Sequence, residues 1–253
     1  MPLPSTVRDV VIDALAFRIR SSPVPAGAEH ARPAVLLHGL GMSQRPLAPL
    51  QDRLALRRPV HVVELPGFGG RPAPLGDVPV DSMIAALARA LDLLGVRDAV
   101  VVGHSLGAQW AVELAAQRPG LASAVVLVSP VVDERRTSRA ALALAILADF
   151  LREPPSIVTI MVTDVLRTDL RWFFAQAERM LRYPLLERVA QLDPPVLVVG
   201  GARDTVVGRP WLRRLRDAAR GPLAIVPRAA HNPQFTAPGA VADAIDRFLE
   251  RRR

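Results

Sequence analysis

The sequence predicts an α/β protein, in which a mostly parallel central sheet is flanked by helices and carries a helical lid insertion. Three observations support this fold class. Short runs of valine, leucine and isoleucine alternate with helical patterns along most of the 253 residues. The alternation stops between residues 131 and 193, and one apolar run turns through Gly-His-Ser-Leu-Gly directly into a helical pattern. Strands that alternate with helices are typical of a parallel sheet covered on both faces.

The expected strands are continuous apolar runs, which suit strands buried on both faces of a sheet. They are expected at residues 10–19, 34–37, 60–64, 99–103, 124–129, 196–200 and 223–227. Helical patterns lie between or after them, at residues 81–94, 106–118, 210–220 and 238–253.

The domain organisation follows from the stretch that lacks strands. Residues 131–193 open with the charged run DERRTSR and continue with apolar helical patterns and a Pro154-Pro155 break. A chain of this length suits one large domain, or a core domain with one insertion. We therefore expect residues 1–130 and 194–253 to form the core domain, and residues 131–193 to form a helical lid or cap.

The charge of the chain does not indicate a nucleic-acid partner. The formal net charge is +8, and all 32 basic residues are arginines. The arginines are spread along the chain and are densest at residues 209–220 and 251–253. Because no aromatic residues interleave with them to stack bases, a solvated basic surface is the better interpretation.

Several other classes are disfavoured by what the sequence lacks. Without cysteine there are no disulfides, thiolate metal sites or cysteine nucleophiles. No H-E-x-x-H motif or glycine-rich phosphate loop occurs, so no metal or organic cofactor is expected. The N-terminus has no signal-peptide pattern, and the most apolar stretch, 140–151, is shorter than the roughly 20 residues that span a bilayer. A cytoplasmic protein without stable membrane insertion is the expectation; the oligomeric state stays open.

The strongest local signal is a G-x-S-x-G motif, Gly103 to Gly107, between a predicted strand and a predicted helix. A strand that turns straight into a helix crowds the positions two before and two after the apex, so only small residues fit there. The apex residue is held in strained geometry, and its hydroxyl projects above the edge of the sheet near a helix N-terminus. The pattern predicts that Ser105 is a nucleophile.

A serine nucleophile needs a base, and the base needs a carboxylate. Of five histidines, His231 alone follows a late strand and precedes the last helix, where the order serine, acid, histidine requires it. Asp204 follows the run PVLVVGG and lies between Ser105 and His231 in sequence. Asp133, just after the run ending VLVSP, is the rival for the acid, but it opens a charged stretch that suits an ion pair or a helix cap.

The loop after the run 34–37 is expected to supply one backbone donor of an oxyanion hole. The N–H of Leu106, directly after the nucleophile, is the other expected donor. By spacing we assign the loop donor to the N–H of Leu40, with Gly41 as the alternative. His38 is expected to hold this loop by hydrogen bonds rather than to act as a base.

The segments HGLGMS, LPGFGGRP, GHSLG, GGARD and AAHNP occur in the order and spacing of the α/β-hydrolase superfamily, which this sequence resembles over nearly its whole length outside residues 131–193. The resemblance is to its lidded esterases, lipases, cofactor-free haloperoxidase-like enzymes and carbon–carbon bond hydrolases. Glu64 and Gly70 stand where aspartate and serine are usual, in a structural loop. A serine nucleophile argues against epoxide hydrolases and haloalkane dehalogenases, which need a carboxylate there.

The resemblance implies a hydrolase that cleaves an ester or thioester of a small to medium apolar acyl substrate through an acyl-enzyme. Carbon–carbon bond hydrolysis is the alternative, for which cationic groups opposite the serine would be needed. A non-catalytic ligand-binding protein on the same fold is the alternative from another class. The candidate residues for the substrate pocket are Trp172 and Phe173, with Met83, Met161 and Met180 as further candidate lining residues. The candidate cations are the lid arginines Arg167, Arg171, Arg179 and Arg182.

Overall fold

The computed structural model of the chain describes residues 5–76, 78–131 and 139–251. Within these residues one eight-stranded sheet has the order β1-β2-β4-β3-β5-β6-β7-β8. Its strands are β1 (Thr6–Ile12), β2 (Leu15–Ser21), β3 (Ala34–Leu37), β4 (Val60–Glu64), β5 (Ala99–His104), β6 (Ala122–Val128), β7 (Val196–Gly201) and β8 (Leu223–Val226).

Strands β3 to β8 run parallel, and β1 and β2 form an antiparallel hairpin at one edge. The prediction of a mostly parallel sheet is therefore confirmed. The single strand predicted at residues 10–19 is wrong, because the chain reverses at Asp13 and Ala14. Both residues have positive φ, +50° and +63°, as the two central residues of a tight hairpin require.

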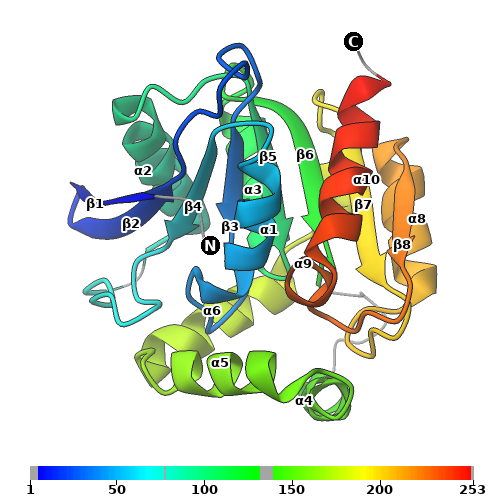
Figure 1. Cartoon of the computed structure of the whole chain (residues 1–253). Helices are drawn as coiled ribbons and strands as arrows, with labels where there is room; N and C mark the ends of the chain where they lie inside the picture. Colours follow the sequence, from blue (N-terminus) through cyan, green and yellow to red (C-terminus); the bar gives the residue numbers. More distant parts are fainter. Residues whose placement is uncertain (1–4, 77, 132–138, 252–253) are drawn as a thin grey trace.

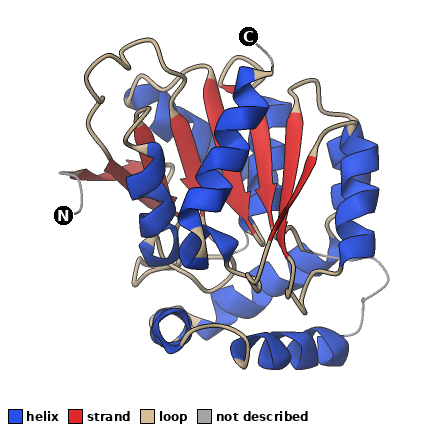
Figure 2. Cartoon of the chain, turned by 45° about the vertical axis from the view of Figure 1, so that its right-hand side comes forward, coloured by secondary structure: helices blue, strands red, loops and turns tan. Residues whose placement is uncertain are grey.

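Helices cover both faces of the sheet (Figures 1 and 2). On one face lie α1 (Ala48–Leu54), α9 (Pro233–Thr236) and α10 (Pro238–Glu250), preceded along the chain by the 3₁₀ turn η1 (Arg45–Leu47). On the other face lie α2 (Val80–Leu93), α3 (Gly107–Gln117) and α8 (Arg209–Ala219).

Alternate residues of the central strands supply the two cores. In β3, Val35 and Leu37 belong to the core beneath α2, α3 and α8, whereas Ala34 and Leu36 belong to the core beneath α1 and α10. Successive side chains of a strand point to opposite faces, so a strand covered on both faces is apolar throughout. This explains the continuous apolar runs in the sequence.

Helices fill the segment between β6 and β7, where the sequence shows no strand. They are α4 (Arg139–Phe150), α5 (Pro155–Val165), α6 (Leu170–Arg182) and α7 (Leu185–Ala190). In Figure 1, α4, α5 and α6 lie below the arrowheads of the strands, across the carboxyl edge of the parallel sheet. In contrast, α7 packs against α3 and α8, which cover one face of the sheet. We call α4, α5 and α6 the inserted helices.

Candidate active site

Ser105 lies at the turn between β5 and α3, in the conformation that its motif predicts. Its φ is +55°, in the left-handed region, and its amide donates a 2.9 Å hydrogen bond to the carbonyl oxygen of Val128. A Cβ atom on Gly103 would lie 2.1 Å from the carbonyl oxygen of Gly107, and one on Gly107 would lie 2.4 Å from that of Leu37. Larger residues at either position would therefore push the turn apart.

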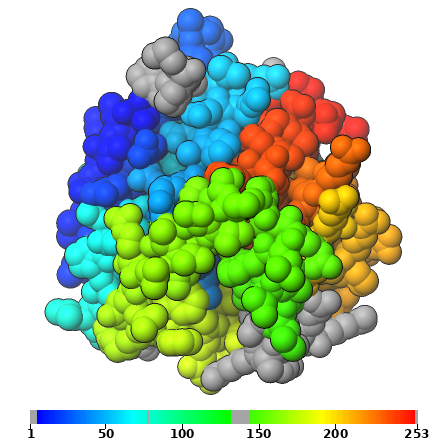
Figure 3. All heavy atoms as spheres, turned by 60° about the horizontal axis from the view of Figure 1, so that its bottom comes forward, coloured from blue at the N-terminus to red at the C-terminus, as the bar shows by residue number. Residues whose placement is uncertain are grey.

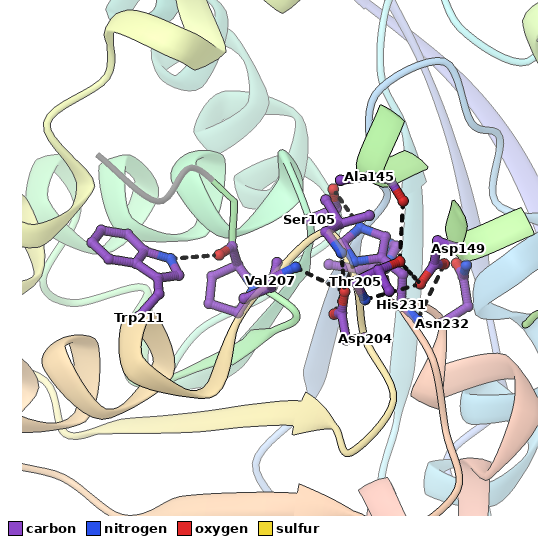
Figure 4. Close-up of polar contacts among 12 residues, drawn as sticks. Ser105, Ala145, Asp149, Asp204, Thr205, Val207, Trp211, His231 and Asn232 are labelled. Carbon is purple, nitrogen blue, oxygen red and sulfur yellow. Dashed lines mark hydrogen bonds and ion pairs between the residues drawn. The ribbon is translucent and has the colours of Figure 1, made fainter. Parts of the chain in front are cut away.

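The side chains of Ser105, His231 and Asp204 lie in a row (Figure 4). The Nε2 atom of His231 is 3.1 Å from Oγ of Ser105, and its Nδ1 atom is 3.0 Å from Oδ2 of Asp204. The three residues follow β5, β7 and β8, whose carboxyl ends share one edge of the sheet. Ser105 thus meets residues 99 and 126 positions later in the chain, because parallel strands end side by side.

The carboxylate of Asp204 is held from both sides. Its Oδ1 atom accepts hydrogen bonds of 2.8 Å from the amides of Val206 and Val207, and its side chain is fully buried. Burial favours the neutral acid, but the charge and hydrogen bond of His231, with the Val207 amide, outweigh it and lower the pKa of Asp204. The aspartate therefore presents a negative charge to Nδ1 of the imidazole.

The pKa of His231 is shifted in the opposite direction. Burial favours the neutral imidazole, but the charge of Asp204 and the hydrogen bond to it prevail, with smaller contributions from Asp149 and Glu153, and raise the pKa. The ring is thus a stronger base than a free histidine, and its Nε2 atom faces the serine hydroxyl.

Two other buried histidines have structural contacts. Nδ1 of His38 donates to the carbonyl oxygen of Gly39 (2.8 Å) while its Nε2 accepts from the amide of Leu65 (3.1 Å), which joins the loops after β3 and β4. Burial lowers the pKa of His38 to about 4 and, together with the charge of His231, that of His104 to about 3. Nε2 of His104 lies 3.0 Å from the backbone oxygen of His231. His104 thus contacts the loop that bears His231, which we call the histidine loop.

The two expected oxyanion donors flank the serine. Leu40 follows β3 and lines the cavity that contains Ser105, and Leu106 is the residue directly after the serine. Among the hydrogen bonds of the described loops and turns, none engages the backbone N–H of Leu40 or Leu106.

A cavity of about 290 Å³ opens onto Ser105 and His231 between the sheet edge and the inserted helices. Besides these two residues its only polar lining side chain among the described residues is Asp149. Figure 3 shows this face, on which atoms of the inserted helices (green to yellow-green) surround a depression. The other lining residues are apolar: Leu40, Met42, Val131, Ile146, Phe150, Met161, Val162, Val165, Leu166, Phe173, Met180 and Val206.

Some of the candidate pocket residues line the cavity and others do not. Phe173, Met161 and Met180 line the cavity, as expected. Trp172 does not; its ring is buried against Gly67, where a Cβ atom would lie 2.4 Å from it. Met83 lies on α2 in the core on one face of the sheet. Helical periodicity explains the first difference, because adjacent residues of α6 point about 100° apart.

None of the four candidate cations lines the cavity; these are Arg167, Arg171, Arg179 and Arg182. Arg167 donates to the carbonyl oxygen of Gly69 and Arg171 to that of Pro74, while Arg182 pairs with Glu178 one turn earlier on α6. The rival acid Asp133 lies outside the described residues.

Sequence reasoning missed three buried carboxylates between β6 and β7, two on the inserted helices and one in the connection from α4 to α5. Asp164 on α5 accepts hydrogen bonds from the amide and hydroxyl of Ser43 (2.9 and 2.7 Å), in the loop that bears Leu40. Asp149 and Glu153 contact the loop that bears His231. For Asp149 and Asp164 the available signal was an acidic residue inside an otherwise apolar helical run, since such residues are rarely buried without a partner.

Comparison with known proteins agrees with this architecture. Residues 34–244 match the model of the alpha/beta hydrolase family, and the chain belongs to that family. An uncharacterized protein of Mycobacterium tuberculosis (strain H37Rv) is 31% identical over 226 residues, which cover 85% of this chain and 63% of that protein. The chain thus spans less than two thirds of that relative's length.

Solved structures share the fold at low sequence identity. A thermophilic esterase from Thermogutta terrifontis superposes with a TM-score of 0.80 and 19% identity, over 97% of this chain and 98% of that one. E-2-(acetamidomethylene)succinate hydrolase superposes with a TM-score of 0.80 and 22% identity, over 98% and 100% of the two chains. At these identities the likeness shows the fold alone.

The described residues show neither a membrane-spanning helix nor a metal-binding cluster. No helix in them has the length and apolar character needed to cross a bilayer. They also contain no cluster of three histidine, aspartate or glutamate side chains arranged to hold a metal ion.

Proposed function

We propose that the chain is a serine hydrolase that cleaves esters or thioesters of small to medium apolar acyl groups, with Ser105, His231 and Asp204 as its catalytic residues. The observation that carries the proposal is the placement of the His231 imidazole between the Ser105 hydroxyl and the Asp204 carboxylate, at the floor of an apolar cavity. Membership in the alpha/beta hydrolase family supports hydrolysis as the reaction.

The geometry supports a two-step reaction. Nε2 of His231 takes the proton of Ser105 as its Oγ atom attacks the substrate carbonyl carbon. The carbonyl oxygen becomes an oxyanion, which accepts hydrogen bonds from the N–H groups of Leu40 and Leu106. When the bond to the leaving group breaks, the imidazolium gives its proton to the leaving oxygen or sulfur. This leaves the acyl group on Ser105.

The second step repeats the proton transfers with water. His231 takes a proton from a water molecule, whose oxygen attacks the acyl carbon. The second oxyanion collapses with release of the acid, and His231 returns the proton to Oγ of Ser105. In both steps Asp204 keeps the proton of the neutral ring on Nδ1 and stabilises the imidazolium. All these groups belong to the chain, so no cofactor enters the scheme.

The substrate class follows from the cavity. An apolar lining favours an acyl chain, and a volume of about 290 Å³ is at the lower end of the roughly 300–1,000 Å³ of small-molecule pockets. Among the described residues that line the cavity there is no arginine to hold an enolate opposite the serine, which favours ester cleavage over carbon–carbon bond hydrolysis. The inserted helices act as the lid of this cavity in our proposal.

Labelling with a fluorophosphonate tests the assignment, because such probes react only with activated serine nucleophiles. The wild-type chain should be labelled stoichiometrically at Ser105, and Ser105→Ala should remove the label. Ser22→Ala is a control, since this buried serine accepts a hydrogen bond from the amide of Val60, at the amino end of β4, and takes no part in the proposed triad. A folded wild-type protein that stays unlabelled would contradict the proposed function.

A further inference from the structure

Two buried carboxylates reach the histidine loop from the inserted helices. Asp149 lies in the last turn of α4, and Glu153 lies in the short connection to α5. Oδ2 of Asp149 accepts a 3.4 Å hydrogen bond from the amide of His231. Oε1 of Glu153 accepts bonds of 2.7 and 2.9 Å from the amide and the side chain of Asn232. The two acids thus hold consecutive backbone amides of this loop.

The same helix also holds the loop that bears Asp204. Oδ1 of Asp149 accepts from the amide and the hydroxyl of Thr205, at 3.3 and 3.2 Å (Figure 4). The Thr205 hydroxyl lies 3.0 Å from the carbonyl oxygen of Ala145, one turn earlier on α4. One carboxylate therefore bridges the segments that carry the acid and the base, although α4 lies more than 50 residues from either in sequence.

Packing alone does not explain these acids. Asp149 is 2% exposed and Glu153 is 6% exposed, and among the described residues neither pairs with an arginine. Burial raises the pKa of both. A buried carboxylate without a cation is costly, and Oε2 of Glu153 has no hydrogen-bond partner in the described structure. An amide side chain would supply the same acceptor oxygen at either position without the cost of a buried charge.

The cation that both acids can serve is the imidazolium of His231. Four titratable groups act on this ring. Asp204 follows β7, Asp149 and Glu153 come from α4 and its connection to α5, and His104 is the last residue of β5. His104 is kept neutral by burial, so it adds no opposing charge. Three carboxylates consequently act on one imidazole, which becomes cationic in the reaction when it takes the proton of the serine or of water.

We propose that Asp149 and Glu153 are positioning residues that act through His231: they fix the backbone of the histidine loop, and Asp149 adds a second negative charge to support the imidazolium. This inference rests on the proposed serine-hydrolase function. In this inference the contacts of α4 hold His231 in place. A movement of α4 that opened the cavity would therefore also break the contacts that hold His231.

The test compares Asp149→Asn and Glu153→Gln with the wild type in the pH dependence of kcat/KM and of fluorophosphonate labelling. Asp149→Asn should lower kcat about tenfold and move the acid limb of both profiles downward by roughly one pH unit, the shift expected when one nearby charge is lost. Glu153→Gln keeps the oxygen that accepts from Asn232. It should shift the acid limb in the same direction by less, and Glu153→Ala should also lower kcat.

Glu113→Gln is the matched control. Glu113 is a buried carboxylate as well, bonded to Tyr183 and Arg188 away from the cavity. Its loss should lower the melting temperature and leave the acid limb where it is, so a shift confined to Asp149 and Glu153 separates an effect on His231 from a general loss of stability.

The outcomes separate this inference from the function on which it rests. If the wild type is labelled but folded Asp149→Asn and Glu153→Gln keep its acid limb and kcat, the inference is wrong and the hydrolase assignment stands. If the wild type is not labelled, the hydrolase assignment itself fails. If Asp149→Asn does not fold, the two Glu153 variants decide: Glu153→Gln removes only the charge, whereas Glu153→Ala also removes the contact with Asn232, and an unchanged kcat in Glu153→Ala would show that the inference is wrong.

Discussion

Replacing Asp204 by asparagine should inactivate the proposed enzyme by reversing the tautomer of His231. The two oxygens of Asp204 have different partners: Oδ1 accepts from the amides of Val206 and Val207, and Oδ2 faces Nδ1 of His231. Because two amide donors face the first position, the carbonyl oxygen of an asparagine must take it. Its NH₂ group then points at His231 as a donor.

A donor at that place changes what the imidazole can do. Nδ1 must become the acceptor, so the proton of the neutral ring moves to Nε2. A protonated Nε2 cannot take the proton of the Ser105 hydroxyl, which lies 3.1 Å away. The same exchange in serine proteases lowers kcat by about 10⁴, and we expect a loss of that size here.

The fold should tolerate this substitution. Asparagine keeps both hydrogen bonds from Val206 and Val207, so the melting temperature should change little. Asp204→Ala leaves those two buried amides without their acceptor, and each unsatisfied group costs about 1–3 kcal/mol. Alanine should therefore reduce both activity and stability, whereas asparagine should reduce activity alone.

Steady-state hydrolysis of p-nitrophenyl butyrate measures the loss, with thermal unfolding in parallel. Asp133→Asn is the control, since Asp133 is the other acid that the sequence offers for this role. Asp204→Asn with more than a tenth of wild-type kcat would refute the tautomer argument. A larger loss in Asp133→Asn than in Asp204→Asn would move the acid to Asp133.

Three further outcomes follow from the same site. Esters of C4 to C8 acids should be cleaved faster than C16 esters, and Met161→Ala should extend the range to longer chains. Met83→Ala, on α2 in the core, should instead cost about 2–5 kcal/mol of stability without changing the preference for acyl-chain length. The same chain-length preference in Met161→Ala and in the wild type would contradict this placement of the acyl chain. Only neutral His231 can act as the base and its pKa is raised, so kcat/KM should fall with decreasing pH around a midpoint above about 6.5. A midpoint well below that value would show that the carboxylates do not act on the ring. Gly107→Ala places a methyl group 2.4 Å from the carbonyl oxygen of Leu37 and should abolish fluorophosphonate labelling; normal labelling would show that the turn can relax.

The elements that the sequence predicted well are those with a local physical cause. A strand covered on both faces must be apolar throughout, so β3, β5, β6 and β7 appear as uninterrupted aliphatic runs. The elbow around Ser105 is partly local: Gly103 is required by its contact with Gly107 in the same turn, whereas Gly107 is required by its contact with the backbone of Leu37 at the end of β3. The parallel sheet and the approximate places of Ser105, Asp204 and His231 at its edge follow from these runs.

The hairpin of β1 and β2 shows where local patterns mislead. Its turn residues, Asp13 and Ala14, lack the glycine or asparagine that usually marks two central residues with positive φ. The two strands therefore merge into one apolar-rich run in the sequence. The antiparallel pairing of β1 with β2, from Thr6 with Ser21 to Ile12 with Leu15, shows the boundary.

By itself the sequence determined the fold class, the nucleophile turn and a short list of acids and bases, because each depends on backbone geometry within a few residues. Tertiary structure alone decided which side chains of the inserted helices meet the site. Trp172 and Phe173 are adjacent, yet only Phe173 faces the cavity, since a helix turns its neighbours about 100° apart and its orientation is set by packing. Asp149 and Glu153 reach His231 only because α4 crosses the sheet edge, about 80 residues before that histidine. A contact across that separation depends on how the helix packs on the sheet, which no local pattern records.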